Sequence, residues 1–135
     1  MSMPTLYTHP DAAHRPYAAA AVHQGVVYAC GQLPRRPDGT TPDDLSEQVV
    51  VALDNLAAVL HEAGGDLHHL LKLTVYLADL ADFDTYNNAY LTRLEGIPLP
   101  PRTTIQVAAF RGATRIEIDA IGAVAPTGSD ERSQP

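Results

Sequence analysis

The clearest pattern along the chain is a single apolar stripe with helical spacing. Its positions recur at intervals of three and four residues: Leu45, Val49, Ala52, Leu53, Leu56, Val59 and Leu60. Helix-start chemistry precedes the stripe, because Thr41 can act as the N-cap, Pro42 suits the first helical position and Asp44 stands three residues after the cap. Gly64 and Gly65 supply a C-terminal stop. The pattern predicts a long amphipathic helix with one buried face.

Strand patterns lie on both sides of this helix. Apolar and polar residues alternate from Leu71 to Ala78, which is typical of a half-buried strand. Further strands are expected at residues 17–22, 26–30, 103–108 and 115–124, with a turn at Gln24-Gly25 between the first two. A second helix is expected over residues 82–94, where Phe83, Tyr86, Tyr90 and Leu94 stand near helical spacing.

In chain order these segments give ββαβαββ, an α+β arrangement. Two helices of this length would cover one face of a mixed sheet. The other face would stay open, and in a small protein such a face is usually buried by self-association. The length of 135 residues indicates one domain, placed at 14–125 between a flexible N-terminal arm (1–13) and a disordered polar tail (126–135).

Composition and charge narrow the class of protein. Apolar residues make up 45%, as in ordinary globular domains, and the formal net charge is −7. A negative surface repels phosphate backbones and anionic headgroups, so neither nucleic acid nor membrane is expected as a partner. One cysteine permits no intrachain disulfide and fits a cytoplasmic protein. No signal-peptide pattern opens the chain, and no apolar run approaches the roughly 20 residues that span a bilayer.

Glu117 is the first candidate for chemistry. In the last strand Ile116 and Ile118 point toward the helix-covered core, so Glu117 between them points to the open face. It is either a solvated charge on an exposed sheet or a carboxylate held in a cleft between subunits.

Arg102 is the second candidate: it opens the preceding strand and is expected on the same sheet face as Glu117. Pro100 and Pro101 restrict the backbone before it, which lowers the entropy lost in placing its side chain. A guanidinium group binds a carboxylate through two parallel hydrogen bonds. Arg102 therefore either anchors a ligand carboxylate or forms a surface ion pair with Glu117 or Asp119, which would contribute only about 0–1 kcal/mol.

Other candidate chemistry is weaker. Cys30 follows an apolar strand, so a buried structural thiol is its default interpretation. The histidines and the cysteine show no spacing for a metal site, and the chain contains no glycine-rich nucleotide motif and no G-x-S-x-G elbow. No metal or organic cofactor is expected.

Six segments spread over residues 15–124 carry a resemblance to a known family. They are Arg15-Pro16-Tyr17, Cys30-Gly31-Gln32-Leu33-Pro34, Glu47-Gln48 through Asn55-Leu56, Asp82-Phe83 with Asn87 and Tyr90, Pro101-Arg102-Thr103-Thr104, and Ile116-Glu117-Ile118. Their order and spacing resemble the RidA/YjgF family of small enamine/imine deaminases. The resemblance implies a chorismate-mutase-like ββαβαββ fold and a homotrimer in which the sheets form a central β-barrel, with three clefts between subunits.

The resemblance also implies roles for particular residues. The arginine matching Arg102 binds the substrate carboxylate in this family, and the glutamate matching Glu117 positions a water molecule. Tyr17 and Asn87 match residues that line the cleft, and the backbone near Gly31 matches a ligand contact. Two further wall positions are occupied here by Cys30, where serine is common, and by Thr104, where cysteine is common.

One other departure affects the expected substrate. The family usually reads Gly-Pro-Tyr-Ser-Gln where this chain has Arg15-Pro16-Tyr17-Ala18-Ala19. The resemblance implies hydrolysis of a reactive 2-imino acid of the 2-iminobutanoate or 2-iminopropanoate type to a 2-oxo acid and ammonia. Because the wall is altered, a larger imine that belongs to a dedicated pathway is an alternative substrate.

Two alternatives come from other classes of protein. One is a non-catalytic trimer that binds small carboxylates or hydrophobic metabolites, or that acts as a holdase. The other is a ribonuclease, an activity sometimes attached to this family. The negative charge, the absence of a basic stripe and the lack of tryptophan for base stacking argue against the ribonuclease.

Overall fold

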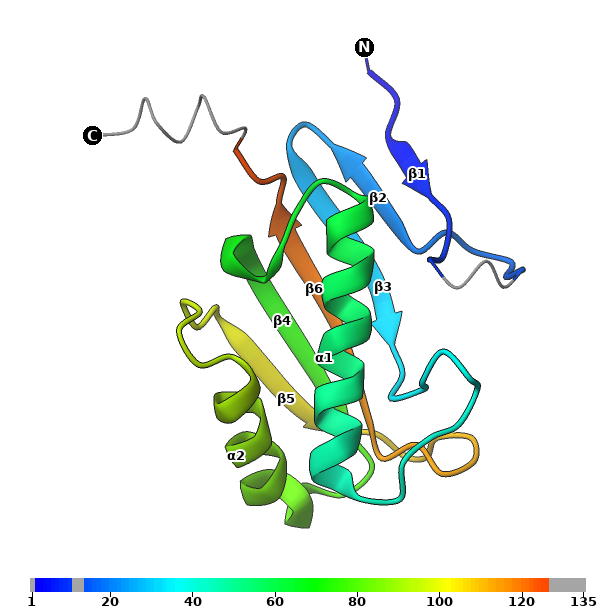
Figure 1. Cartoon of the computed structure of the whole chain (residues 1–135), viewed down its shortest axis with the longest axis vertical. Helices are drawn as coiled ribbons and strands as arrows, with labels where there is room; N and C mark the ends of the chain where they lie inside the picture. Colours follow the sequence, from blue (N-terminus) through cyan, green and yellow to red (C-terminus); the bar gives the residue numbers. More distant parts are fainter. Residues whose placement is uncertain (1, 11–13, 127–135) are drawn as a thin grey trace.

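The protein is a mixed six-stranded sheet with both α-helices on one face (Figure 1). The computed structural model describes residues 2–10 and 14–126. The elements are β1 (Thr5–Tyr7), β2 (Ala20–His23), β3 (Val26–Gln32), α1 (Leu45–Glu62), η1 (Leu67–His69), β4 (Leu70–Leu77), η2 (Leu80–Asp82), α2 (Phe83–Arg93), β5 (Arg102–Gln106) and β6 (Ile116–Ala123). The sheet order is β1-β2-β3-β6-β4-β5, with β4 and β5 parallel and the other neighbours antiparallel. The predicted α+β architecture is confirmed.

Helix α1 packs its apolar stripe on the sheet, as the spacing predicts. Leu53, Leu56 and Leu60 are fully buried in one core with residues of β4 and β6. The helix begins later than expected, because Asp44 is the N-cap: its backbone is extended and its side chain accepts a hydrogen bond from the Glu47 amide at 3.0 Å. An anionic cap also complements the positive end of the helix dipole.

The N-terminal region is more ordered than the sequence predicts. Thr5–Tyr7 pairs antiparallel with β2, and the Ala19 amide donates to the Tyr7 carbonyl at 2.8 Å. A flexible arm is therefore wrong for these three residues, whose strand is too short to show an alternating pattern. The strand expected at 17–22 begins only at Ala20. Residues 1, 11–13 and 127–135 of the expected arm and tail lie outside the described residues.

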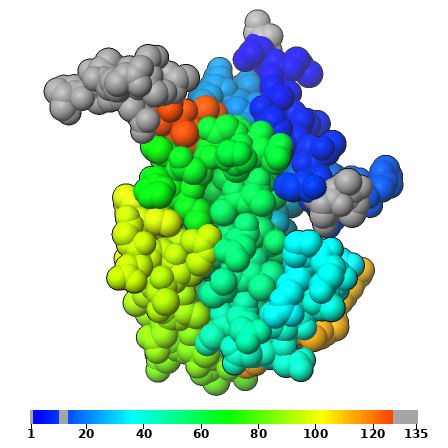
Figure 2. Space-filling model, viewed as in Figure 1, coloured from blue at the N-terminus to red at the C-terminus, as the bar shows by residue number. Residues whose placement is uncertain are grey.

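The two faces of the sheet differ sharply. On one side α1, α2 and the segment 33–44 form a continuous surface that hides much of the sheet (Figure 2). On the other side the register places Tyr28 opposite Ile121, and both side chains are substantially exposed. The expectation of an uncovered sheet face is confirmed for the chain by itself. Among the described residues no helix is both long and apolar enough to cross a membrane.

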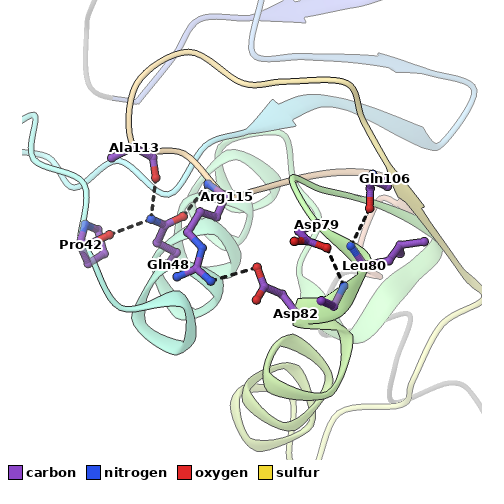
Figure 3. Close-up of polar contacts among 9 residues, drawn as sticks. Pro42, Gln48, Asp79, Leu80, Asp82, Gln106, Ala113 and Arg115 are labelled. Atoms are coloured by element: carbon purple, nitrogen blue, oxygen red, sulfur yellow. Dashed lines mark hydrogen bonds and ion pairs between the residues drawn. The ribbon is translucent and has the colours of Figure 1, made fainter.

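A buried glutamine ties the helices to the segment that leads into β6 (Figure 3). Gln48 on α1 is fully buried, and its Nε2 donates to the Pro42 and Ala113 carbonyls at 2.8 and 2.9 Å. Its Oε1 accepts from the Arg115 amide at 2.8 Å, and Arg115 forms an ion pair with Asp82, at the start of α2, at 2.9 Å. Since an unsatisfied buried polar group costs about 1–3 kcal/mol, this network holds the entry to β6 in one position relative to both helices.

Candidate active site

Arg102 lies in an aromatic cage built by α2. Its guanidinium carbon is 5.7, 5.1 and 4.6 Å from the ring centroids of Phe83, Tyr86 and Tyr90, and its Nη1 donates to Asn87 Oδ1 at 2.8 Å. These four residues recur at helical spacing, so one stripe of α2 faces the arginine. The attraction between a cation and aromatic rings strengthens when both are shielded from water. These contacts therefore hold the Arg102 side chain in one position.

Thr104 lies in the same cage. Its hydroxyl shares a hydrogen bond of 2.8 Å with the hydroxyl of Tyr86, a residue with no exposed surface. Burial raises the pKa of Tyr86 and of Tyr90, so both rings stay neutral at ordinary pH and leave Arg102 as the charged group. We call the following residues the Arg102 cluster: Arg102, Phe83, Tyr86, Asn87, Tyr90 and Thr104.

Glu117 lies on the open face and reaches β3. Its carboxylate occupies the space that a Cβ atom would fill at Gly31, so a side chain at position 31 would collide with it. Burial, and to a smaller extent the charge of Asp119, raise the pKa of Glu117. Asp119 itself accepts a hydrogen bond of 2.8 Å from the Tyr76 hydroxyl, which raises the pKa of Tyr76 to about 12. A carboxylate whose pKa is raised in this way is a candidate for proton transfer.

A groove of about 480 Å³ begins at Glu117. Gly31, Tyr17 and Arg15 line it beside the carboxylate, and it continues to Asn55 on α1. Cys30 is next to this region, since the charges of Arg15 and Glu117 both influence the pKa of its thiol. Burial raises the pKa of the Cys30 thiol, and its Sγ accepts a hydrogen bond from Gln32, so the structural interpretation fits better than a nucleophile. We call Glu117, Gly31, Tyr17, Cys30 and Arg15 the Glu117 cluster.

The two clusters lie on opposite faces of one sheet. Register pairs Arg102 with Leu73 and Leu73 with Ala120, all of which face the helices, whereas Glu117 pairs with Tyr76 on the open face. The two Cα atoms are two strands and three residues apart, which is about 14 Å. A single copy of the chain thus does not bring the guanidinium and the Glu117 carboxylate to one small ligand.

This arrangement corrects two expectations. The sequence interpretation placed Arg102 and Glu117 on the same sheet face, and that prediction is wrong. The face on which Arg102 lies is set by the parallel pairing of β5 with β4. Counting residues along the chain cannot reveal this pairing. The alternative of an ion pair from Arg102 to Glu117 or Asp119 is also wrong. Asn87 is the hydrogen-bond partner of Arg102.

Sequence reasoning also missed two features. The sequence analysis used Tyr86 and Tyr90 to predict the second helix and gave them no role beside Arg102, although both rings surround the arginine. The spacing of Phe83, Tyr86, Asn87 and Tyr90 was the available signal. The groove beyond Arg15 had no signal, because its walls come from distant segments. Among residues 2–10 and 14–126, no group of three or more potential metal ligands is gathered in one place.

Fold and clusters together define a small α+β protein with a caged guanidinium suited to a carboxylate ligand. A sequence profile of the family described as "Endoribonuclease L-PSP" matches residues 8–124. The chain belongs to this family, which is the RidA/YjgF family that its motifs indicate.

Characterised relatives and solved structures agree with this assignment. The chain is 38% identical to mouse 2-iminobutanoate/2-iminopropanoate deaminase over 121 residues, 88% of this chain and 89% of the relative. The E. coli yjgF gene product superposes with a TM-score of 0.79 at 31% identity, covering 90% and 98% of the two chains. E. coli TdcF with bound serine superposes with a TM-score of 0.78 at 31% identity, covering 84% and 91%.

Proposed function

We propose that this protein is an imine deaminase that hydrolyses short 2-imino acids to 2-oxo acids and ammonia. The observation that carries the proposal is the caged, charged Arg102, because a fixed guanidinium can hold the carboxylate of such a substrate in one orientation. The deaminase names of similar proteins support the same reaction. Ribonuclease chemistry has less support, since a chain with a net charge of −7 repels a phosphate backbone.

The site is completed, in this proposal, by a second copy of the chain in a homotrimer. Arg102 and Glu117 lie on opposite faces, so a ligand that touches both must sit between copies. The uncovered sheet face supplies apolar surface for association, including Tyr28, Ile105 and Ile121, which are 49%, 43% and 36% exposed. Closed association of three such faces would bury them in a barrel and leave three equivalent clefts.

In the proposed reaction Arg102 fixes the substrate carboxylate, so the imine carbon takes one position. Glu117 of the facing copy removes a proton from water while the water oxygen bonds to that carbon and the carbon–nitrogen double bond becomes single. Glu117 then passes the proton to nitrogen, which gives the carbinolamine. Glu117 next takes the hydroxyl proton and passes it to the amine, so that ammonia leaves as the carbonyl of the 2-oxo acid forms. The raised pKa of Glu117 suits both proton transfers. An imine carbon is already electrophilic, so these residues suffice without a cofactor.

The remaining site residues position this pair. Asn87 fixes the guanidinium through its hydrogen bond, and Thr104 closes the wall beside it through Tyr86. Gly31 leaves the space that the Glu117 carboxylate needs and offers its backbone to the ligand. Tyr17 lines the groove, and Cys30, next to Gly31 in the chain, keeps a neutral thiol beside it because burial raises its pKa.

A coupled assay tests the function directly. An amino-acid oxidase releases imino acids of increasing size, and we expect the protein to accelerate formation of the 2-oxo acid above the spontaneous rate. Binding of small carboxylates without any acceleration would instead support a non-catalytic carboxylate-binding trimer.

A further inference from the structure

Two carboxylates on the open face of β6 are drawn toward opposite neighbouring strands. In the sheet, β6 lies between β3 and β4. The Glu117 carboxylate reaches over Gly31 on β3, whereas Asp119 Oδ2 accepts a hydrogen bond of 2.8 Å from the Tyr76 hydroxyl on β4. Residues two apart on a strand share a face, so these two like charges would otherwise be close neighbours. Their partners on the adjacent strands keep them apart.

The hydroxyl that binds Asp119 comes from a diagonal position on β4. Register pairs Tyr76 with Glu117 and Thr74 with Asp119. Diagonal neighbours on one face are about 7–8 Å apart, a separation that a tyrosine side chain can span. The hydrogen bond to Asp119 raises the pKa of Tyr76 to about 12, so the hydroxyl keeps its proton at neutral pH. Asp119 therefore has a lasting hydrogen-bond donor on the side away from β3.

The groove contains one of the two carboxylates. Among the described residues that line it, Glu117 is present and Asp119 is not. Two carboxylates side by side do not both ionise freely, and they titrate as a pair that shares one proton. If Asp119 turned into the groove, it would compete with Glu117 for the proton of a bound water. The hydrogen bond from Tyr76 holds Asp119 in the opposite direction.

The other charged and titratable groups near the pair have different positions or partners. Lys72, on the same strand as Tyr76, donates from Nζ to the Thr103 hydroxyl at 2.9 Å. Cys30 on β3 stays neutral, because burial raises the pKa of its thiol. The remaining groups line the groove with Glu117: His9, Arg15, Arg35 and Arg36. Tyr76 is thus the group on β4 that sets the direction of Asp119.

We propose that Tyr76 is a positioning residue whose hydroxyl holds Asp119 toward β4 and out of the groove, so that Glu117 is the carboxylate that takes the proton of the attacking water. This inference rests on the proposed function. Tyr76 acts through Asp119 rather than on the ligand. Asp119 keeps its negative charge near Glu117, at a position fixed by the hydrogen bond.

A titration without substrate tests the positioning by itself. Isotope-labelled carboxyl carbons of glutamate and aspartate are followed by NMR as the pH is changed. In the wild-type protein we expect a single step for Glu117. Tyr76→Phe removes only the hydroxyl and frees Asp119 to approach. The Glu117 signal should then follow two steps, the upper one about one pH unit above the wild-type midpoint.

Tyr28→Phe is the matched control. Tyr28 is a tyrosine on the same open face, and its register partner is Ile121 rather than an acidic residue. Its variant loses the same hydroxyl and should titrate as the wild-type protein does. An equal shift of the Glu117 titration in Tyr28→Phe would overturn the specific role of Tyr76.

A double variant shows whether Tyr76 acts through Asp119. In Tyr76→Phe/Asp119→Asn no second carboxylate remains to be released, so Glu117 should titrate as in Asp119→Asn alone. The acidic limb of kcat/KM should move to higher pH in Tyr76→Phe and to lower pH in Asp119→Asn. A merely structural role of Tyr76 would lower Tm without moving this limb.

Two results would overturn the proposal. One is a Glu117 titration in Tyr76→Phe that matches the wild-type protein, and the other is a double variant that differs from Asp119→Asn. Failure of the wild-type protein to hydrolyse any imine would contradict the proposed function alone, because the NMR titration still decides whether Tyr76 positions Asp119.

Discussion

The Arg102 cluster and the Glu117 cluster hold their charged groups in different ways. Arg102 is enclosed by rings and an amide that all come from α2, so one element fixes it. Glu117 is held at a strand on the open face, against a glycine of β3 and beside a groove formed by distant segments. The first arrangement suits an anchor whose position must not change. The arrangement around Glu117 suits a base that exchanges protons beside a groove open to ligands of different shapes.

The largest expected effect comes from removing the anchor. Arg102→Ala should lower kcat/KM for imine hydrolysis by about a thousandfold, because the carboxylate loses both its charge partner and its orientation. Arg102→Lys keeps the charge but lacks the planar fork, so it should recover only part of the loss. Steady-state kinetics measure both variants. Wild-type turnover in Arg102→Ala with an unchanged oligomeric state would rule out the anchoring role.

Removal of the base Glu117 should lower activity less than removal of Arg102. Glu117→Gln keeps the size of the side chain, so we expect carboxylate binding to persist while kcat falls about a hundredfold. The rate of spontaneous imine hydrolysis is the lowest rate that this assay can measure. Calorimetry with a 2-oxo acid separates the two steps, and a loss of binding with normal turnover of bound substrate would mean that the water is positioned elsewhere.

A methyl group at position 31 should disturb the Glu117 cluster alone. In Gly31→Ala the new Cβ displaces the Glu117 carboxylate, whereas the backbone φ at this position is not in the left-handed region and stays unstrained. We expect about a tenfold loss of kcat with little change in Tm.

A double variant is the control for this mechanism. Glu117→Asp shortens the side chain and relieves the collision, so adding Gly31→Ala to Glu117→Asp should cost almost nothing further. Additive losses in the double variant would show that Gly31 acts through something other than Glu117.

The smallest effect is a change in pH dependence. Glu117 must be ionised to accept a proton, and its pKa is raised by burial and by Asp119, so the acidic limb of kcat/KM should lie above the pH typical of a free glutamate. Asp119→Asn removes the like charge and should move that limb toward lower pH. A limb that does not move would indicate that another group controls the rate.

Much of the fold could be predicted from local patterns. The stripe of α1 and the alternation in β4 and β6 are each set by burial of one face, so the spacing of apolar residues reveals them. The strand Thr5–Tyr7 could not be predicted, since three residues show no period and their order comes from pairing with β2. The start of α1 was misplaced because Thr41 and Asp44 are both good caps, and only the backbone geometry selects Asp44.

The candidate site was predicted less completely. Arg102 and Glu117 were identified from their residue types, their neighbours and a family resemblance. Their relation in space depends on strand register, which no local pattern encodes. The cage around Arg102 depends on how α2 lies over β5, a tertiary contact that the spacing of Phe83, Tyr86, Asn87 and Tyr90 only suggests.

The account depends on one claim, that Arg102 of one copy and Glu117 of another form a single site. The direct measurement is subunit mixing, in which Arg102→Ala and Glu117→Gln chains are coexpressed, or unfolded and refolded together, and assayed for imine hydrolysis. Random assembly should place an intact Arg102 opposite an intact Glu117 in about one quarter of the sites, so activity should rise to about a quarter of the wild-type value. If mixed assemblies form but remain as inactive as the separate variants, the two residues do not act across subunits.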